Sequence, residues 1–194
     1  MSGGRVPNEG MWIWERVQEW GSAPDPRALP ALLALLRIED AWFPESTKVR
    51  RAAAWALGRL GLDAVDQLLA DPKGGELARE GAADALGYVR GIEAVKRLHD
   101  LALDGSPRVV LWAALSLAKH GESAVDALRD GLERAVGFRS AAHLADALRI
   151  VDSASAQTAL DRHLATAAPD RAEALRHLLT RRALLERCEA GMPS

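Results

Sequence analysis

Leucines recur along this chain at an almost constant spacing, and this spacing limits the possible folds more than any other feature. The positions are Leu57, Leu86, Leu117, Leu148 and Leu179, separated by 29, 31, 31 and 31 residues. A period of about 30 residues is typical of arrays in which each repeat is one supersecondary unit. The sequence therefore predicts stacked copies of a small motif, because one copy alone could not bury its apolar face.

Two kinds of segment alternate within this array. The first kind begins with an alanine followed by spaced apolar residues, and its copies start at Ala28, Ala64, Ala94, Ala124 and Ala156. The second kind is rich in alanine, and its copies start at Val49, Ala78, Val109 and Ser140. Both kinds show helical periodicity, while β-branched residues are few and never alternate with polar ones, so we expect helices and no sheet.

Short signals indicate where these helices begin and end. Ser106-Pro107 predicts an N-cap with a first-turn proline, and Ser123 with Asp126 predicts a capping box. Glycines at 61, 91 and 121 are placed where a positive φ is wanted after a helix. We expect helix pairs at about 24–61, 62–91, 92–121, 122–152 and 153–189, within one domain spanning 10–190. A disordered N-terminus at 1–9 and a tail at 191–194 would lie outside it.

The segment from Val49 to Gly61 reads Val-Arg-Arg-Ala-Ala-Ala-Trp-Ala-Leu-Gly-Arg-Leu-Gly. It resembles the HEAT-repeat superfamily, and most of all the short repeats of phycobilin-lyase-like proteins. The resemblance implies an all-α fold: a right-handed α-solenoid of about five helical hairpins whose second helices line the concave side. It implies little about function, because one scaffold serves many roles.

Two segments depart from the repeat. Residues 11–20 place Ile13, Val17 and Trp20 on one helical face, which predicts an N-terminal helix that caps the first repeat. Ala28 and Ala64 are 36 residues apart, against 30 for the next two spacings, and the extra residues fall within 38–47. Trp42 and Phe43 in this insertion are either packed against the first repeat or available to a partner.

Positions on the second helices that the core does not use are candidates for binding. We expect them to form a surface of large apolar side chains surrounded by polar groups. The set is Trp55, Arg59, Asp84, Tyr88, Leu111, Trp112, Leu115, Lys119, His143 and Asp146. The competing interpretation is that the large side chains, Trp112 and Leu115 above all, fill the interior of a tightly curved solenoid.

Charge and motifs narrow the classes of function. The chain has 25 basic and 27 acidic side chains, a net charge of −2, which disfavours nucleic acid as a partner. Cys188 is the single cysteine, and the five histidines lack i, i+4 pairing, so no metal or other cofactor is expected. No apolar run reaches the roughly 18 residues of a membrane span. We therefore expect a cytoplasmic, non-catalytic scaffold or adaptor that binds a peptide or helix of another protein.

One enzymatic alternative stays open. Alkylpurine DNA glycosylases are also HEAT-like solenoids, and they work through concave tryptophans and a carboxylate. In such an enzyme Trp55 and Trp112 would take the aromatic roles, and Asp84 or Asp146 would supply the carboxylate. A DNA groove should be strongly basic, whereas acidic residues share this surface. A bilin-lyase-type chromophore chaperone is a further alternative, favoured by the type of repeat alone.

Overall fold

The computed structural model describes residues 9–37, 46–71 and 74–190, with side-chain burial given for 12–37, 47–71 and 74–183. Every regular element in these ranges is helical. The predicted all-α fold is therefore confirmed for the part of the chain that the structure describes. The handedness and the number of repeats stay predictions.

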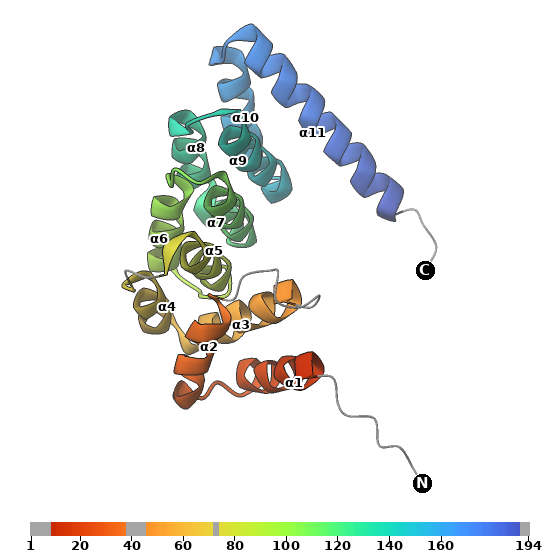
Figure 1. Ribbon diagram of the computed structural model, residues 1–194. Helices are drawn as coiled ribbons and strands as arrows, with labels where there is room; N and C mark the ends of the chain where they lie inside the picture. Colours follow the sequence, from red (N-terminus) through yellow and green to blue (C-terminus); the bar gives the residue numbers. More distant parts are fainter. Residues whose placement is uncertain (1–8, 38–45, 72–73, 191–194) are drawn as a thin grey trace. The chain divides into compact units, whose positions relative to one another are not determined.

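The chain divides into two compact units, residues 1–94 and 95–194. Unit 1 contains α1 (Glu9–Ser22), the 3-10 turn η1 (Pro26–Ala28), α2 (Leu29–Leu35), α3 (Ser46–Leu60), α4 (Leu62–Leu69) and α5 (Gly75–Leu86) (Figure 1). The boundary falls in the first turn of α6 (Ile92–Ala102). Unit 2 continues with α7 (Pro107–Lys119), η2 (Gly121–Ala124), α8 (Val125–Arg134), α9 (Phe138–Val151), α10 (Ala154–Thr166) and α11 (Pro169–Ala190). Apart from α1 and the two 3-10 turns, these helices follow one another in the order of the expected pairs.

Unit 1 is held together by α3, which packs against α1, α2, α4 and α5. Its buried face is built from small residues: Ala53 and Ala54 on α3 are almost fully buried, as are Ala82 and Ala83 on α5. Small side chains let helix backbones approach closely. Gly58 marks one close approach, because a Cβ atom there would lie 2.3 Å from the backbone oxygen of Ala85.

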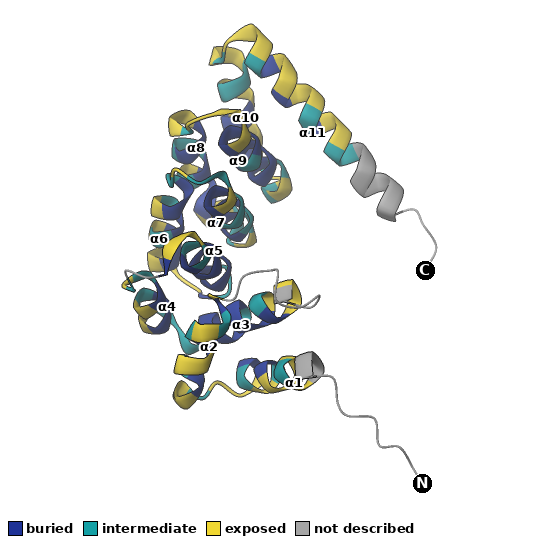
Figure 2. Ribbon diagram, in the orientation of Figure 1, coloured by how far each residue is buried: buried dark blue, intermediate teal, exposed yellow. Residues whose placement is uncertain are grey.

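Unit 2 is built around α9, which packs against α7, α8, α10 and α11. The repeating leucines form its core, since Leu117 and Leu148 are at most 1 % exposed. Helix α11 buries one stripe, of which Leu175 and Leu179 are members, while most of its described surface is exposed (Figure 2). The leucine spacing in the sequence therefore corresponds to buried positions on every second helix, from α3 to α11.

The predicted helix signals have mixed outcomes. Ser106 caps α7 by accepting a hydrogen bond from the Arg108 backbone N–H (3.2 Å), with Pro107 in the first turn, as expected. The glycines at 61, 91 and 121 have φ of 99°, 108° and 60°, which confirms their predicted conformation. The prediction of a capping box at Ser123 and Asp126 is wrong. Ser123 lies inside η2, and its hydroxyl donates to the His120 carbonyl oxygen (2.9 Å), a local bond that competes with the cap.

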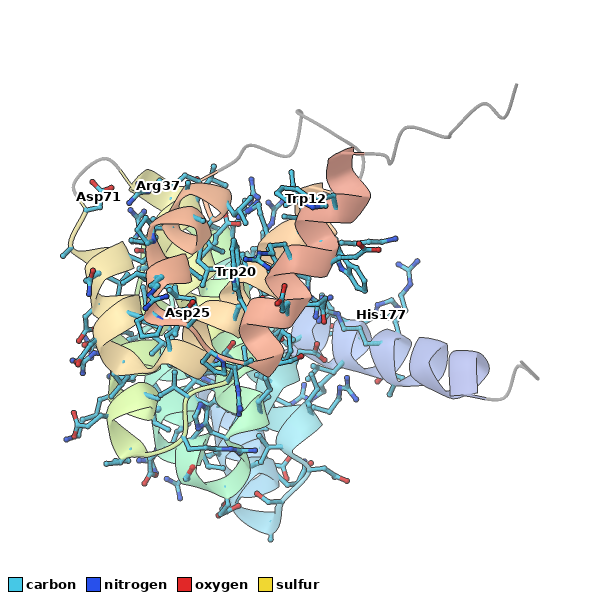
Figure 3. The ribbon with its side chains drawn as sticks, turned by 90° about the horizontal axis from the view of Figure 1, so that it is seen from below. Trp12, Trp20, Asp25, Arg37, Asp71 and His177 are labelled. Carbon is cyan, nitrogen blue, oxygen red and sulfur yellow. The ribbon has the colours of Figure 1, made fainter. Side chains whose placement is uncertain are left out.

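Two ion pairs join helices of unit 1. Arg37, just after α2, pairs with Asp71, just after α4, and the two side chains lie close together in Figure 3. Arg50 on α3 places Nη2 3.5 Å from Oε2 of Glu80 on α5, and the Glu80 side chain is 2 % exposed. Both pairs link segments that are far apart in sequence: the first connects the ends of α2 and α4, and the second connects α3 to α5.

The close contact at Gly58 gives a testable prediction. Gly58→Ala should lower the free energy of unfolding by about 1–3 kcal/mol, because the added methyl meets the backbone of α5 and not a movable side chain. The matched control is Gly131→Ala in α8, where the nearest atom to a new Cβ is Leu144 Cδ2 at 3.4 Å. This change should be neutral or stabilising by up to about 1 kcal/mol. Urea unfolding followed by circular dichroism measures both, and equal effects would contradict the packing argument.

Candidate functional site

An open hollow of about 360 Å³ lies in unit 1 between α1 and α3, and we call it the α1–α3 groove. Its lining comes from α1, α3 and the residues that follow α5. The lining residues are Trp14, Gln18, Lys48, Arg51, Ala52, Trp55 and Tyr88.

Helical spacing explains why these side chains meet. On α1, Trp14 and Gln18 are one turn apart, and on α3 the residues Lys48, Ala52 and Trp55 recur at intervals of four and three. Residues at such spacings share one face of a helix. Because α1 packs along α3, the two stripes lie on either side of one hollow.

The indole of Trp55 packs against Gly21 of α1. A Cβ atom at Gly21 would lie 2.1 Å from Cζ3 of Trp55, so the ring occupies space that any other residue at position 21 would need. The indole thus lies directly against the backbone of α1. Trp55 is only half-buried, so part of the ring is open to the groove. Packing on one side and exposure on the other make it a rigid, accessible aromatic surface.

The charged residues that line the groove are all basic. Lys48 and Arg51 are both exposed, and among the described residues that line the groove there is no carboxylate. The remaining lining consists of aromatic, small and amide side chains. Arg59, one turn beyond Trp55 on α3, is also exposed and continues the same stripe by its spacing. The groove therefore combines an aromatic floor with a positive edge.

The sequence predicted this site only in part. Trp55 and Tyr88 line the groove, whereas Asp84, expected on the same surface, is 4 % exposed and belongs to the buried part of unit 1. Trp42 and Phe43 lie outside the described residues. The predicted set included Arg59 but not Lys48, Arg51 or the residues of α1, because residues 11–20 were expected only to cap the first repeat. The signal that could have indicated this is the i, i+4 spacing of Trp14 and Gln18, which places the two side chains on one face of α1, while Val17 is the buried residue of this helix turn.

Apart from Arg59 on α3, the other predicted binding residues are in unit 2. Leu111, Trp112 and Leu115 are partly buried on α7, Lys119 near its end is exposed, and α7 packs against α9, which carries His143 and Asp146. Their role in binding stays a prediction.

Asp146 lies within a network of charges in unit 2. Its carboxylate is 5 % exposed, and it accepts hydrogen bonds from Arg149 Nε (3.0 Å) and from Arg182 on α11. The contact with Arg182 ties α11 to α9, and the two contacts together explain how a carboxylate is tolerated at a buried position.

His143 is the titratable group that this environment changes most clearly. Burial lowers the pKa of its imidazole, the nearby Arg182 and Arg139 lower it further, and Asp146 opposes the change. Its Nδ1 atom is buried without a hydrogen-bond partner. These features favour the neutral ring. Among the described residues no group of three or more His, Cys, Asp or Glu is arranged to hold a metal ion.

Comparison with known proteins finds a family that resembles one segment of the chain. The family model described as PBS lyase HEAT-like repeat matches residues 49–70, which run along α3, through Gly61 and into α4. The predicted resemblance is confirmed there: this segment is similar to a PBS lyase HEAT-like repeat, and the part of the chain that the structure describes is all-helical. A search of curated proteins gives no match. None of the helices in the described ranges is both long and apolar enough to cross a bilayer.

The lowered pKa of His143 predicts a dependence of stability on pH. In the unfolded chain the imidazole of His143 takes up a proton near pH 6.5, whereas in the folded chain it does so only at lower pH. In the pH range between the two pKa values the unfolded state therefore binds more protons than the folded state. The free energy of unfolding should therefore fall as the pH drops from about 7.5 to about 5.5. In His143→Asn the fall should be smaller. Urea titrations of both proteins across this range measure the difference, and an equal fall in the variant would show that His143 is not responsible.

Proposed function

We propose that this chain is a non-catalytic scaffold or adaptor that binds a segment of another protein in the α1–α3 groove. One observation carries the proposal: two incompletely buried tryptophans, Trp14 on α1 and Trp55 on α3, line one hollow. Trp14 is 42 % exposed, a costly state for a large apolar side chain unless something covers it.

The composition of the groove supports binding to protein. Tryptophan, tyrosine and arginine are the residues most enriched where protein interfaces concentrate their binding energy, and Trp14, Trp55, Tyr88 and Arg51 all line this hollow. Its volume is near the lower end of the roughly 300–1,000 Å³ typical of ligand pockets. A few side chains of a helix or peptide would fill it.

The same lining argues against catalysis in the groove. Its described residues include no His, Cys, Ser or carboxylate, the groups that most often act as nucleophile or as general acid and base. The glycosylase alternative needs a carboxylate at the substrate, but Asp84 and Asp146 are both buried, and two arginines hold Asp146. Although the matching family model carries the word lyase in its name, we therefore propose binding as the function.

The experiment is site-specific photocrosslinking in the native cell. A photoreactive amino acid replaces Arg59, which is exposed and one turn from Trp55, and crosslinked proteins are identified by mass spectrometry. Trp14→Ala in this background should reduce the yield of a specific crosslinked protein at least about fivefold, because a truncated anchor costs 1 kcal/mol or more. Trp55→Ala should do the same.

The matched control is Trp12→Ala. Trp12 lies on the same helix and is 64 % exposed, but it does not line the α1–α3 groove. It should leave the crosslinking unchanged. Melting curves accompany each variant, since Trp55 also packs against Gly21, and Trp14→Ala tests the proposal even if Trp55→Ala destabilises the unit. Crosslinks that persist in Trp14→Ala would contradict the proposed site. Release of alkylated purines from DNA by the purified chain would instead favour the enzymatic alternative.

A further inference from the structure

We infer that the occupant of the α1–α3 groove is a proline-rich segment in the polyproline II (PPII) conformation. This inference rests on the proposed function and adds the composition and conformation of the partner. The first argument is the aromatic lining: Trp14, Trp55 and Tyr88 come from three parts of unit 1 and line one open hollow. Proline-rich segments dock in grooves lined by aromatic side chains, and their backbone is already ordered before they bind.

The positions of two of these rings along α1 match the repeat of a PPII helix. Trp14 is on α1, and the ring of Trp55 packs against Gly21 of the same helix. From position 14 to position 21 is nearly two helical turns, so both positions lie on one face of α1, roughly 10 Å apart along its axis. A PPII helix has three residues per turn and rises about 3.1 Å per residue, so its side chains at i and i+3 share a face and lie about 9 Å apart. Prolines at i and i+3 can therefore contact one ring each.

This spacing is less suitable for a β-strand. The side chains of a strand alternate between two faces, and its rise is about 3.3 Å per residue, so residues on one face are about 6.6 Å or about 13 Å apart. An α-helix does match the distance, because its residues i and i+7 are about 10 Å apart on one face. The hydrogen-bonding groups of the groove decide between an α-helix and PPII.

The lining is rich in hydrogen-bond donors and contains no carboxylate among its described residues. The indoles of Trp14 and Trp55 and the amide of Gln18 each carry N–H groups, and within the described ranges none of these side chains forms a hydrogen bond. Gln18 lies between positions 14 and 21 on α1. In an α-helix the backbone carbonyl groups are bonded internally, whereas in PPII they have no internal partner and can accept from such donors. Proline also lacks an N–H group, so a proline-rich segment needs donors and not acceptors.

Single-stranded nucleic acid is the competing ligand, because its bases also stack on aromatic rings. Its affinity depends strongly on the neutralisation of phosphates. The chain has a net charge of −2, and of the two cations in the lining Arg51 already has an interaction within the structure. A proline-rich segment needs no such charge, so it fits the groove better.

The test is a selection from a displayed library of random linear peptides of about 12 residues, using the full-length chain as bait. We expect the enriched peptides to carry two prolines at i and i+3. Replacing either proline with alanine should weaken binding at least about fivefold, measured by isothermal titration calorimetry. The matched control peptide has the same composition with its two prolines at i and i+2, and it should be weakened by a similar factor.

Variants of the chain test the groove. Gln18→Met keeps an unbranched side chain of similar length but removes the amide, and it should weaken the selected peptides about two- to tenfold. Since Gln18 forms no hydrogen bond with another described residue, this variant should keep the melting temperature of the wild type. Trp14→Ala should weaken binding at least about fivefold. Trp12→Ala is the matched control and should bind as the wild type does, because Trp12 is on α1 (Figure 3) but lines a separate hollow between α1 and α2.

The outcomes separate the inference from the proposed function. Peptides that depend on Trp14 but lack the paired prolines, or whose affinity is unchanged in Gln18→Met, would overturn the PPII occupant and leave the protein-binding groove intact. A library that yields no peptide dependent on Trp14 or Trp55 would overturn both. A single-stranded oligonucleotide of about 12 nucleotides that binds more tightly than the selected peptides would also overturn the inference.

Discussion

The structure depends on the close approach of helix backbones at positions that carry only alanine or glycine. In unit 1, where α3 packs against α5, Ala53 and Ala54 of α3 and Ala82 and Ala83 of α5 are almost fully buried, and a Cβ atom at Gly58 would lie 2.3 Å from the backbone oxygen of Ala85. A methyl group added at Gly58 would meet the backbone of α5 and not the end of a flexible side chain, so the packing tolerates little change at this position. The leucines at the repeating positions then complete the core around these contacts.

The same principle, applied between α1 and α3, creates the candidate site. Gly21 leaves room for the Trp55 indole against the backbone of α1, so the ring is fixed without being enclosed. The stripe of α3 that carries Trp55 also carries Lys48 and Arg51, which places a positive edge beside the aromatic surface. A binding surface of this kind needs no strained backbone or catalytic group, only a capping helix that covers the first repeat incompletely.

Much of the fold could be predicted because the sequence repeats. The spacing of Leu57 and Leu86 marks equivalent core positions, and the glycines at 61 and 91 mark helix boundaries through their need for positive φ. The site was less predictable. Asp84 and Trp55 occupy the same aligned position in two repeats, yet Asp84 is buried and Trp55 lines a groove. The pattern of one helix specifies which face a residue occupies, but exposure depends on which neighbour covers that face.

The sequence by itself determined that the described part of this chain is helical and that its repeating leucines and alanines are buried, because these features follow from local propensity and from periodicity. Tertiary structure alone decided that α1 contributes Trp14 and Gln18 to a groove with α3, and that Asp146 on α9 is tied to Arg182 on α11. The physical reason is that both arrangements depend on the distance and angle between two helices. Those quantities are set by the packing of all the side chains between them and are not encoded in any one segment.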